Sequence, residues 1–373
     1  MESVLKREIY DLGYDISSVD NGRVTFTGDM EAAVRANIGL RTAERILLKV
    51  GEFRAESFVE LFEGTKALPW HEFLPADARF WVTKAASVRS KLFSPSDIQS
   101  IMKKAMVVSM GRHYGMSVLP EDGPSFPVRV MIKDDIATAA LDTTGESLHK
   151  RGYRRFTVKA PIAENLAASL LMLTPWSEGR ILVDPFCGSG TFPIEAALMS
   201  AHIAPGLRRS FTCETWDGLI PASTWEDVRS EAEEEIDLTA ETDLQGYDID
   251  PAAIEAARNN ARLAGVEKLI HFQVRDVASL SHHGKYGFII ANPPYGERLL
   301  KDDPEIFALY RTLGERFKAL DTWSMYLISA YEQTESALGL KAAKNRKIYN
   351  GMLRSYFYQF PGPKPAARRK ENP

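Results

Sequence analysis

The chain has 373 residues, of which 45% are hydrophobic and 26% charged, a composition typical of globular proteins with two or three domains. The net charge of −4 gives no general sign of nucleic-acid binding, so such a site needs a local basic patch. Two cysteines are too few for a disulfide framework or a zinc site. The N-terminus carries no secretion pattern and no apolar stretch is long enough for a membrane span, which predicts a cytoplasmic protein that binds neither membrane nor metal.

Residues 1–55 alternate helix and strand patterns and predict a small α+β unit. A helix with apolar positions from Val4 to Leu12 precedes a strand at residues 23–27. Asp29 is placed to cap the next helix, and residues 46–50 form another expected strand.

A second α+β unit is expected from residue 56 to about 145, and it carries the local positive charge. From Arg79 to Arg112 the chain has seven basic residues against one acid, Asp97, so this segment is 7 − 1 = +6. Such a segment attracts a polyanion, although the segment by itself is better explained as a solvated helix face, and the nucleic-acid interpretation depends on the catalytic half. The candidate contacts to a nucleic-acid backbone are Arg79, Lys84, Arg89, Lys91, Lys103 and Lys104.

A strand, a glycine turn and a helix follow between residues 181 and 198. Glycines at 188 and 190 allow a ligand to approach the backbone, and the helix N-terminus directs N–H groups towards it. A dinucleotide site would have another glycine where this chain has Pro193. The acid before the turn favours a cofactor with a cationic or amino group, and S-adenosylmethionine fits. The candidate cofactor residues here are Asp184, Phe186, Gly188, Gly190 and Thr191.

The next two strands also end in acids. Asp248 follows the second strand, where a ribose diol is held in such folds, and Asp250 is the better candidate for a helix cap before Pro251. Asp276 follows the third strand and could accept from an adenine amino group, with Val277 packing on the ring. A simple strand-ending turn explains Asp276 equally well.

The fourth strand, residues 286–291, leads into Asn292-Pro293-Pro294-Tyr295. An amide oxygen, a proline carbonyl and an aromatic ring suit a planar group with an exocyclic amine. The alternative is that this stretch is only a proline-rich turn at the end of the strand. Because ligands of open α/β sheets bind beyond the carboxyl ends of the strands, the four tips are expected to converge on one crevice. A helix at 306–317, a strand at 325–329 and a closing antiparallel hairpin are expected to follow.

Two of these stretches resemble motifs I and IV of class I S-adenosylmethionine-dependent methyltransferases, namely Asp184 to Thr191 and Asn292 to Arg298. They are most similar to the branch labelled N6-adenine-specific DNA methylases, which includes the 23S rRNA guanine-N2 methyltransferases of the RlmL type. Residues 147–154, with Pro161 and Glu164, resemble that family's junction and motif X. Residues 56–150 resemble a THUMP domain, an RNA-binding module that follows a ferredoxin-like unit.

The resemblance implies a Rossmann-like domain with a seven-stranded mixed sheet whose last strand is antiparallel. The implied domains are a ferredoxin-like unit at 1–55, a THUMP domain at 56–155 and a methyltransferase domain at 156–373. The RlmL-type enzyme of enteric bacteria has a second methyltransferase domain downstream, which this chain lacks, so a single activity is expected.

The resemblance also implies residue roles and a reaction. Methyl transfer from S-adenosylmethionine to guanine N2 of 23S rRNA is expected, with adenine N6 in DNA or RNA, a protein glutamine amide, and RNA binding without catalysis as alternatives. The implied cofactor residues are Pro161, Glu164, Asp184, Gly188 and Gly190 at the methionine end, Asp248 at the ribose and Asp276 at the adenine, together with Asn292. The implied catalytic residues are Asn292, Pro293, Pro294 and Tyr295, and no role is derived for Glu297 and Arg298.

Overall fold

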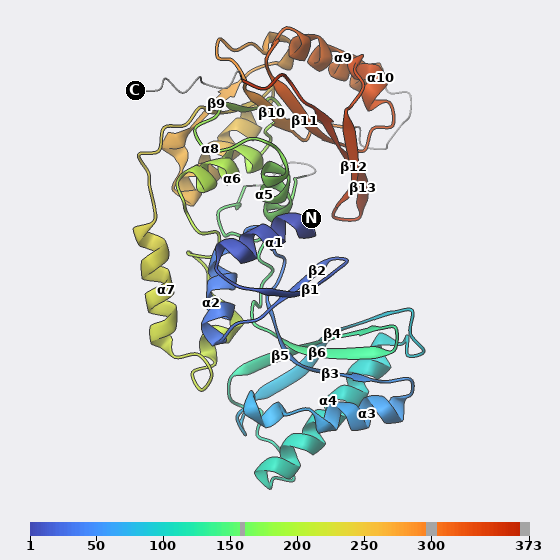
Figure 1. Cartoon of the computed structure of the whole chain (residues 1–373). Helices are drawn as coiled ribbons and strands as arrows, with labels where there is room; N and C mark the ends of the chain where they lie inside the picture. Colours follow the sequence, from blue (N-terminus) through green and yellow to red (C-terminus); the bar gives the residue numbers. More distant parts are fainter. Residues whose placement is uncertain (157–160, 296–303, 366–373) are drawn as a thin grey trace, which may run out of the picture. The chain divides into compact units, whose positions relative to one another are not determined.

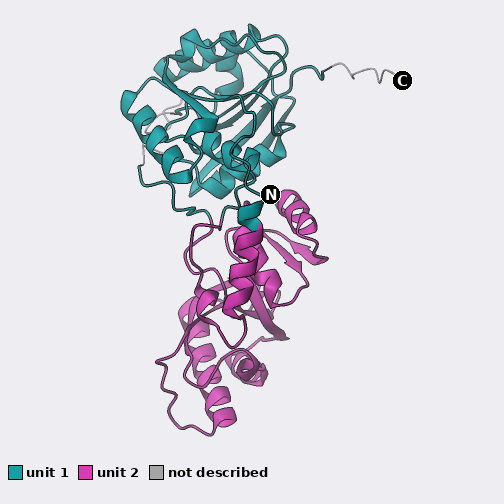
Figure 2. Cartoon of the chain, turned by 90° about the vertical axis from the view of Figure 1, so that its left-hand side faces the viewer, with its two compact units in different colours: residues 1, 149–205, 232–373 teal, residues 2–148, 206–231 magenta. Residues whose placement is uncertain are grey.

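The structure is a computed structural model that describes residues 1–156, 161–295 and 304–365 (Figure 1). It divides into two compact units, one of residues 2–148 with 206–231 and one of residues 1, 149–205 and 232–373 (Figure 2). Glu297 and Arg298, which end the motif IV stretch, lie outside the described residues. Within the described ranges, every helix is too short or too polar to cross a membrane.

The first unit begins with two helices and a two-stranded antiparallel ribbon. The predicted cap is confirmed, because the Asp29 carboxylate accepts from the Ala32 N–H at 3.0 Å at the start of α2. The strand expected at 46–50 lies instead in a second sheet, where it pairs with β6. The elements are α1 (Glu2–Asp11), β1 (Ile16–Asp20), β2 (Arg23–Phe26) and α2 (Met30–Gly39).

That second sheet has four strands in the order β3-β6-β5-β4, with α3 packed against α4 and α4 against β4. β4 and β5 are parallel and the other pairs are antiparallel. Phe80, Met102 and Val128 are fully buried between sheet and helices. The elements are β3 (Leu47–Arg54), α3 (Phe58–Ala67), η1 (Trp70–Glu72), β4 (Arg79–Val88), α4 (Pro95–Tyr114), β5 (Ser125–Lys133) and β6 (Ile136–Asp142).

A later segment of the chain, which the sequence analysis did not identify, packs into this first unit. Residues 206–231, with η2 (Thr212–Thr215) and the start of α7 (Ala222–Glu234), belong to it. The Trp216 indole donates to the Ser125 carbonyl at 2.8 Å, and its ring stacks on Phe126 with centroids 4.5 Å apart. At Gly206 a Cβ would lie 2.4 Å from the Asn37 carbonyl oxygen, so only glycine fits this crossing.

The second unit is built on a seven-stranded mixed sheet in the order β12-β13-β11-β10-β7-β8-β9. Five strands are parallel and the last strand of the chain, β13, is antiparallel to both its neighbours, as expected. The strands are β7 (Leu182–Asp184), β8 (Leu244–Asp248), β9 (Ile270–Val274), β10 (Phe288–Ala291), β11 (Ser324–Ser329), β12 (Lys344–Asn350) and β13 (Leu353–Phe360).

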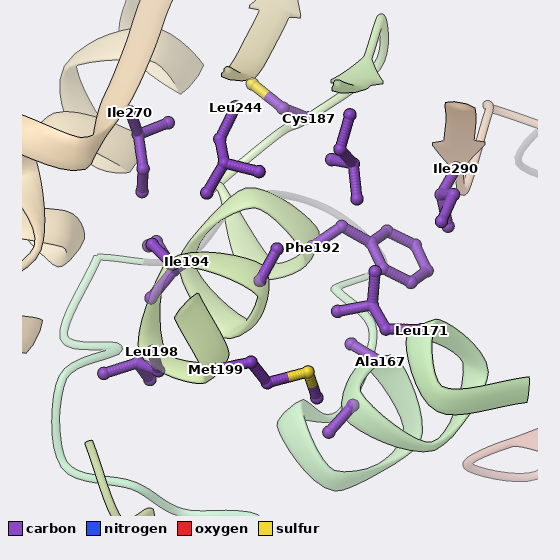
Figure 3. Close-up of a cluster of buried hydrophobic side chains, with 14 of the residues drawn as sticks. Ala167, Leu171, Cys187, Phe192, Ile194, Leu198, Met199, Leu244, Ile270 and Ile290 are labelled. Atoms are coloured by element: carbon purple, nitrogen blue, oxygen red, sulfur yellow. The ribbon is translucent and has the colours of Figure 1, made fainter. Parts of the chain in front are cut away.

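Helices cover both faces of this sheet, because its central strands bury side chains on both sides. Leu182 belongs to a core formed with α5, α6 and α8, whereas Val183 belongs to one formed with α9 and α10. Figure 3 shows the first of these cores around Phe192 and Ile194 of α6. The sheet is therefore Rossmann-like, and its helices are α5 (Glu164–Leu173), α6 (Thr191–Ser200), α8 (Pro251–Ala264), α9 (Pro304–Lys318) and α10 (Thr334–Leu338).

Candidate active site

Two N–H groups of the glycine turn after β7 donate hydrogen bonds to the tip of β8. Cys187 donates its N–H to the Tyr247 carbonyl at 2.8 Å, and Gly188 donates to the Asp248 carboxylate at 3.0 Å. Gly190 has φ +87°, and a Cβ there would lie 3.0 Å from the Ala257 Cβ. Gly190 is thus required for close packing of the turn on α8, in addition to any approach of a ligand.

Two carboxylates stand beside this turn, at the tips of neighbouring strands. The Asp184 carboxyl is buried and accepts from the Phe186 N–H at 3.0 Å. Burial raises its pKa well above the usual value, and repulsion from Asp248 raises it further. A cationic ligand would stabilise the ionised form of Asp184, so the pair favours a positively charged group.

The other predicted acids cap helices. Asp250 accepts from the Ala252 N–H at 2.9 Å at the start of α8, as expected. Asp276 is exposed and accepts from the Ala278 N–H at 2.7 Å at the start of η4 (Val277–Ser279), while Val277 is buried. The strand-ending turn considered for Asp276 is therefore present, and the carboxylate retains acceptor positions for a ligand.

Buried charges surround the start of α5. The Arg154 guanidinium bonds to the Glu164 carboxylate at 2.8 Å and to the Ile162 carbonyl at 2.6 Å. Burial raises the pKa of Glu164, and Arg154 partly offsets that rise. On α6, the fully buried Glu195 accepts from the Tyr153 hydroxyl at 3.0 Å. Pro161, the other predicted residue here, is exposed.

Sequence reasoning missed Asn260, which contacts the glycine turn. It lies on α8, is fully buried, and donates from its amide nitrogen to the carbonyls of Phe156 at 2.8 Å and Ser189 at 3.1 Å. Its amide oxygen accepts from the Phe156 N–H at 3.2 Å. One side chain therefore joins the glycine turn to the segment before α5. A polar residue on the buried stripe of α8 was the available indication.

The fourth tip follows β10, next to β7 in the sheet. Asn292 is partly exposed, Pro293 is buried and Pro294 is exposed. Tyr295 packs partly against the core under α9. Burial raises the Tyr295 pKa, and the Asn350 side chain, which lies near the hydroxyl, offsets part of that rise.

A hydroxyl network holds the tip of the neighbouring strand, β11. The Ser329 hydroxyl is bonded to the Tyr310 hydroxyl at 2.8 Å and to that of Thr334 at 2.9 Å. Ser329 is fully buried, so this network fixes α9 and α10 against the sheet beside the fourth tip.

The strand tips thus share the carboxyl edge of one sheet. β10, β7, β8 and β9 are consecutive neighbours in it, which places Asn292, Asp184, Asp248 and Asp276 in that order. Across the described ranges, no three His, Cys, Asp or Glu side chains cluster as metal ligands do.

The basic residues of the other unit are more neutralised than the sequence suggests. Arg89 pairs with Asp134 at 2.7 Å, Lys91 pairs with Glu56, and Lys103 pairs with Glu121 at 2.6 Å. These acids come from other segments, so the count of +6 overstates the free charge. Lys84 and Lys104 are exposed, and Arg79 bonds to Ser125. A cleft of about 510 Å³ lies between β4 and α4, lined by Arg79, Trp81, Gln99, Lys103 and Glu121.

Comparison with known proteins matches three family models along the chain. The RlmL ferredoxin-like domain matches residues 1–47, the THUMP domain residues 55–142, and the RMKL-like methyltransferase domain residues 151–358.

Full-length relatives agree with these matches. The Bacillus subtilis (strain 168) protein "Putative RNA methyltransferase YpsC" is 42% identical over 96% of this chain and 93% of its own. The solved structure of "a possible methylase from Clostridium difficile 630" is 48% identical, covers 98% of this chain and 97% of its own, and has a TM-score of 0.94. SMU.472, solved in complex with SAH, is 43% identical with a TM-score of 0.91, covering 98% and 96% of the two chains. The chain belongs to the family with an RMKL-like methyltransferase domain preceded by RlmL ferredoxin-like and THUMP domains.

Proposed function

We propose that this chain transfers a methyl group from S-adenosylmethionine to the exocyclic amine of a base in RNA, with guanine N2 of 23S rRNA as the target. The observation that carries this proposal is the shared sheet edge, where the Asn292 tip follows β10 beside the Asp184 carboxylate after β7, with that of Asp248 one strand further on. Adjacent strands can therefore bind the positively charged methyl donor and the amine that accepts the methyl group.

The carboxylates at the tips of β7, β8 and β9 fit S-adenosylmethionine, the cofactor of this methyltransferase. SMU.472, which matches 96% of its own length, carries the demethylated product SAH. The buried Asp184 and neighbouring Asp248 suit the cationic methionine end and a ribose diol, and Asp276 suits an adenine amine. Bound there, the cofactor supplies the methyl group.

On the acceptor side, Asn292 and the Pro293 carbonyl orient the amine. An exocyclic amine is conjugated with its base, so its lone pair is a weak nucleophile. Two acceptors on its N–H groups favour a tetrahedral nitrogen and direct the lone pair away from them. Alignment of this kind contributes about 7–11 kcal/mol. Asn292 is an amide, so it positions the nitrogen and does not remove a proton.

Tyr295 provides the ring for the target base. A base must leave its stack to reach this edge, which costs a few kcal/mol, and stacking on an aromatic ring returns about 1–3 kcal/mol. Tyr295 is half-buried, so part of its ring remains accessible to a base.

RNA is the favoured substrate because the same chain carries a THUMP domain, an RNA-binding module, and because YpsC is named for RNA methylation.

The test supplies labelled S-adenosylmethionine with 23S rRNA, tRNA, DNA and protein, followed by nucleoside analysis. We expect N2-methylguanosine from 23S rRNA. N6-methyladenosine would move the target to adenine, and label confined to DNA or protein would contradict the proposal.

A further inference from the structure

The β12–β13 hairpin projects past the rest of the sheet. Ser329, the last residue of β11, pairs with Tyr356 of β13, whereas β12 and β13 continue together as far as Asn350 and Leu353. Three residues of ribbon, about 10 Å, therefore extend beyond β11 at the carboxyl edge (Figure 1). This is the edge at which β10 ends before Asn292.

The hairpin is strongly basic, and its β12 cations are not neutralised as those of the first unit are, although the Tyr356 hydroxyl and, less strongly, the Glu332 charge raise the pKa of Arg354 on β13. Residues 336–365 contain six basic residues and no acid. Lys344 and Lys347 are exposed and Arg346 is partly exposed. Over the described ranges, none of these three side chains has an ion-pair partner within 4.0 Å.

Aromatic rings alternate with these charges. Tyr349 is 57% exposed, and the Lys347 ammonium lies 5.2 Å from its ring centroid. The Arg354 guanidinium lies 5.3 Å from the ring centroid of Tyr356. At the turn, Met352 is completely exposed. Cations for phosphates beside an exposed ring for a base are typical of a surface that binds single-stranded nucleic acid.

The hairpin also reaches the acceptor tip. The side chain of Asn350, the last residue of β12, lies close enough to the Tyr295 hydroxyl to offset part of the rise in its pKa that burial causes. A strand of RNA lying on the hairpin would thus lead to the ring proposed to hold the target base.

We propose that the β12–β13 hairpin is an RNA-binding surface of the catalytic unit, which holds unpaired nucleotides flanking the target base. This proposal rests on the proposed function. Lysines on an edge strand also prevent pairing with a second copy, but that role accounts for neither the exposed Tyr349 nor Met352. Charge complementarity and stacking together favour RNA.

The test compares two double variants with the same change in charge. Lys347→Glu with Arg354→Glu reverses charge on the hairpin, whereas Lys268→Glu with Lys285→Glu does so at exposed positions before β9 and β10. We expect the hairpin variant to raise the KM for RNA about tenfold at low salt. Its slope of log KM against log salt should fall by about two, one for each lost phosphate contact. The kcat at saturating RNA, the cofactor affinity and the Tm should match those of the control.

A second measurement does not depend on charge reversal. Met352 replaced by the photoreactive p-benzoylphenylalanine should cross-link to RNA, and the same replacement at the exposed Leu263 of α8 should not. Equal KM values for the two double variants, or no cross-link from position 352, would overturn the proposal. A dimeric wild type that becomes monomeric only in the hairpin variant would assign the hairpin to contacts between copies and overturn it as well. Failure of the proposed function is distinguishable, because the wild-type protein would then methylate no RNA.

Discussion

The two halves of the seven-stranded sheet carry opposite chemistry at the same edge. The tips of β7, β8 and β9 are acidic, with Asp184, Asp248 and Asp276. The tip of β10 has the Asn292 amide, and the tip of β11 has the Ser329 hydroxyl. The β12–β13 hairpin beyond them is basic, and residues 336–365 contain no acid. A parallel sheet brings all these tips to one edge, so one fold can hold a cationic donor beside a polyanionic acceptor. Variants that alter one half should leave the other unchanged.

The largest expected effect is on the acceptor half. Asn292→Ala removes one of the two proposed acceptors for the amine, and kcat should fall by about 10²- to 10³-fold, as for loss of an aimed hydrogen-bonding group elsewhere. Cofactor affinity, measured by calorimetry, should change less than about twofold, because the carboxylates after β7 and β8 are intact. Lost cofactor binding with normal turnover at saturation would place Asn292 in the donor half instead.

Asp184→Asn should affect the donor half, weakening cofactor binding by about 10- to 100-fold, since a charge-assisted contact is lost. The pH dependence gives a sharper readout. Burial raises the Asp184 pKa, so the free carboxyl keeps its proton above the usual range. A cationic ligand favours the ionised form; affinity should therefore rise with pH until the carboxyl has ionised in the free protein, and then level off. Calorimetry in buffers of different ionisation enthalpy should show proton release on binding, which the variant lacks.

The Asn260→Ala variant has a close control in Asn37→Ala. Both asparagines are fully buried, and the Asn37 side chain bonds to Ala33, Thr143 and Thr144 within the other unit. Each variant should lose about 1–3 kcal/mol of unfolding free energy. Only Asn260→Ala should also raise the cofactor KM, by roughly fivefold, because it releases the glycine turn. Equal cofactor KM values would show that Asn260 only stabilises the fold.

The smallest effect is expected in the THUMP domain. Lys104→Glu, at an exposed position, should weaken RNA binding about threefold at low salt and hardly at all at high salt. Lys103 pairs with Glu121, so Lys103→Glu places two acids together and should lower Tm more than Lys104→Glu does. Unchanged RNA affinity in both variants would remove this surface from RNA binding and leave the hairpin as the main basic contact.

Local patterns in the sequence determined most of the catalytic half. The caps at Asp29 and Asp250 and the strand ends at Asp184 and Asp248 follow from residues close in the chain. Turn and cap chemistry acts over two to four residues, so a linear sequence records it directly. The family motifs added the seven-stranded sheet with its antiparallel last strand, which the structure confirms.

Only the tertiary structure decided the features made by distant segments. Asp134, Glu56 and Glu121 neutralise basic residues from outside the segment that was counted. Residues 206–231 join the first unit, and Asn260 reaches Phe156 across 104 positions. The length of the hairpin beyond β11 depends on strand register. Such contacts are chosen by packing and by satisfaction of buried polar groups, which involve partners that no local pattern specifies.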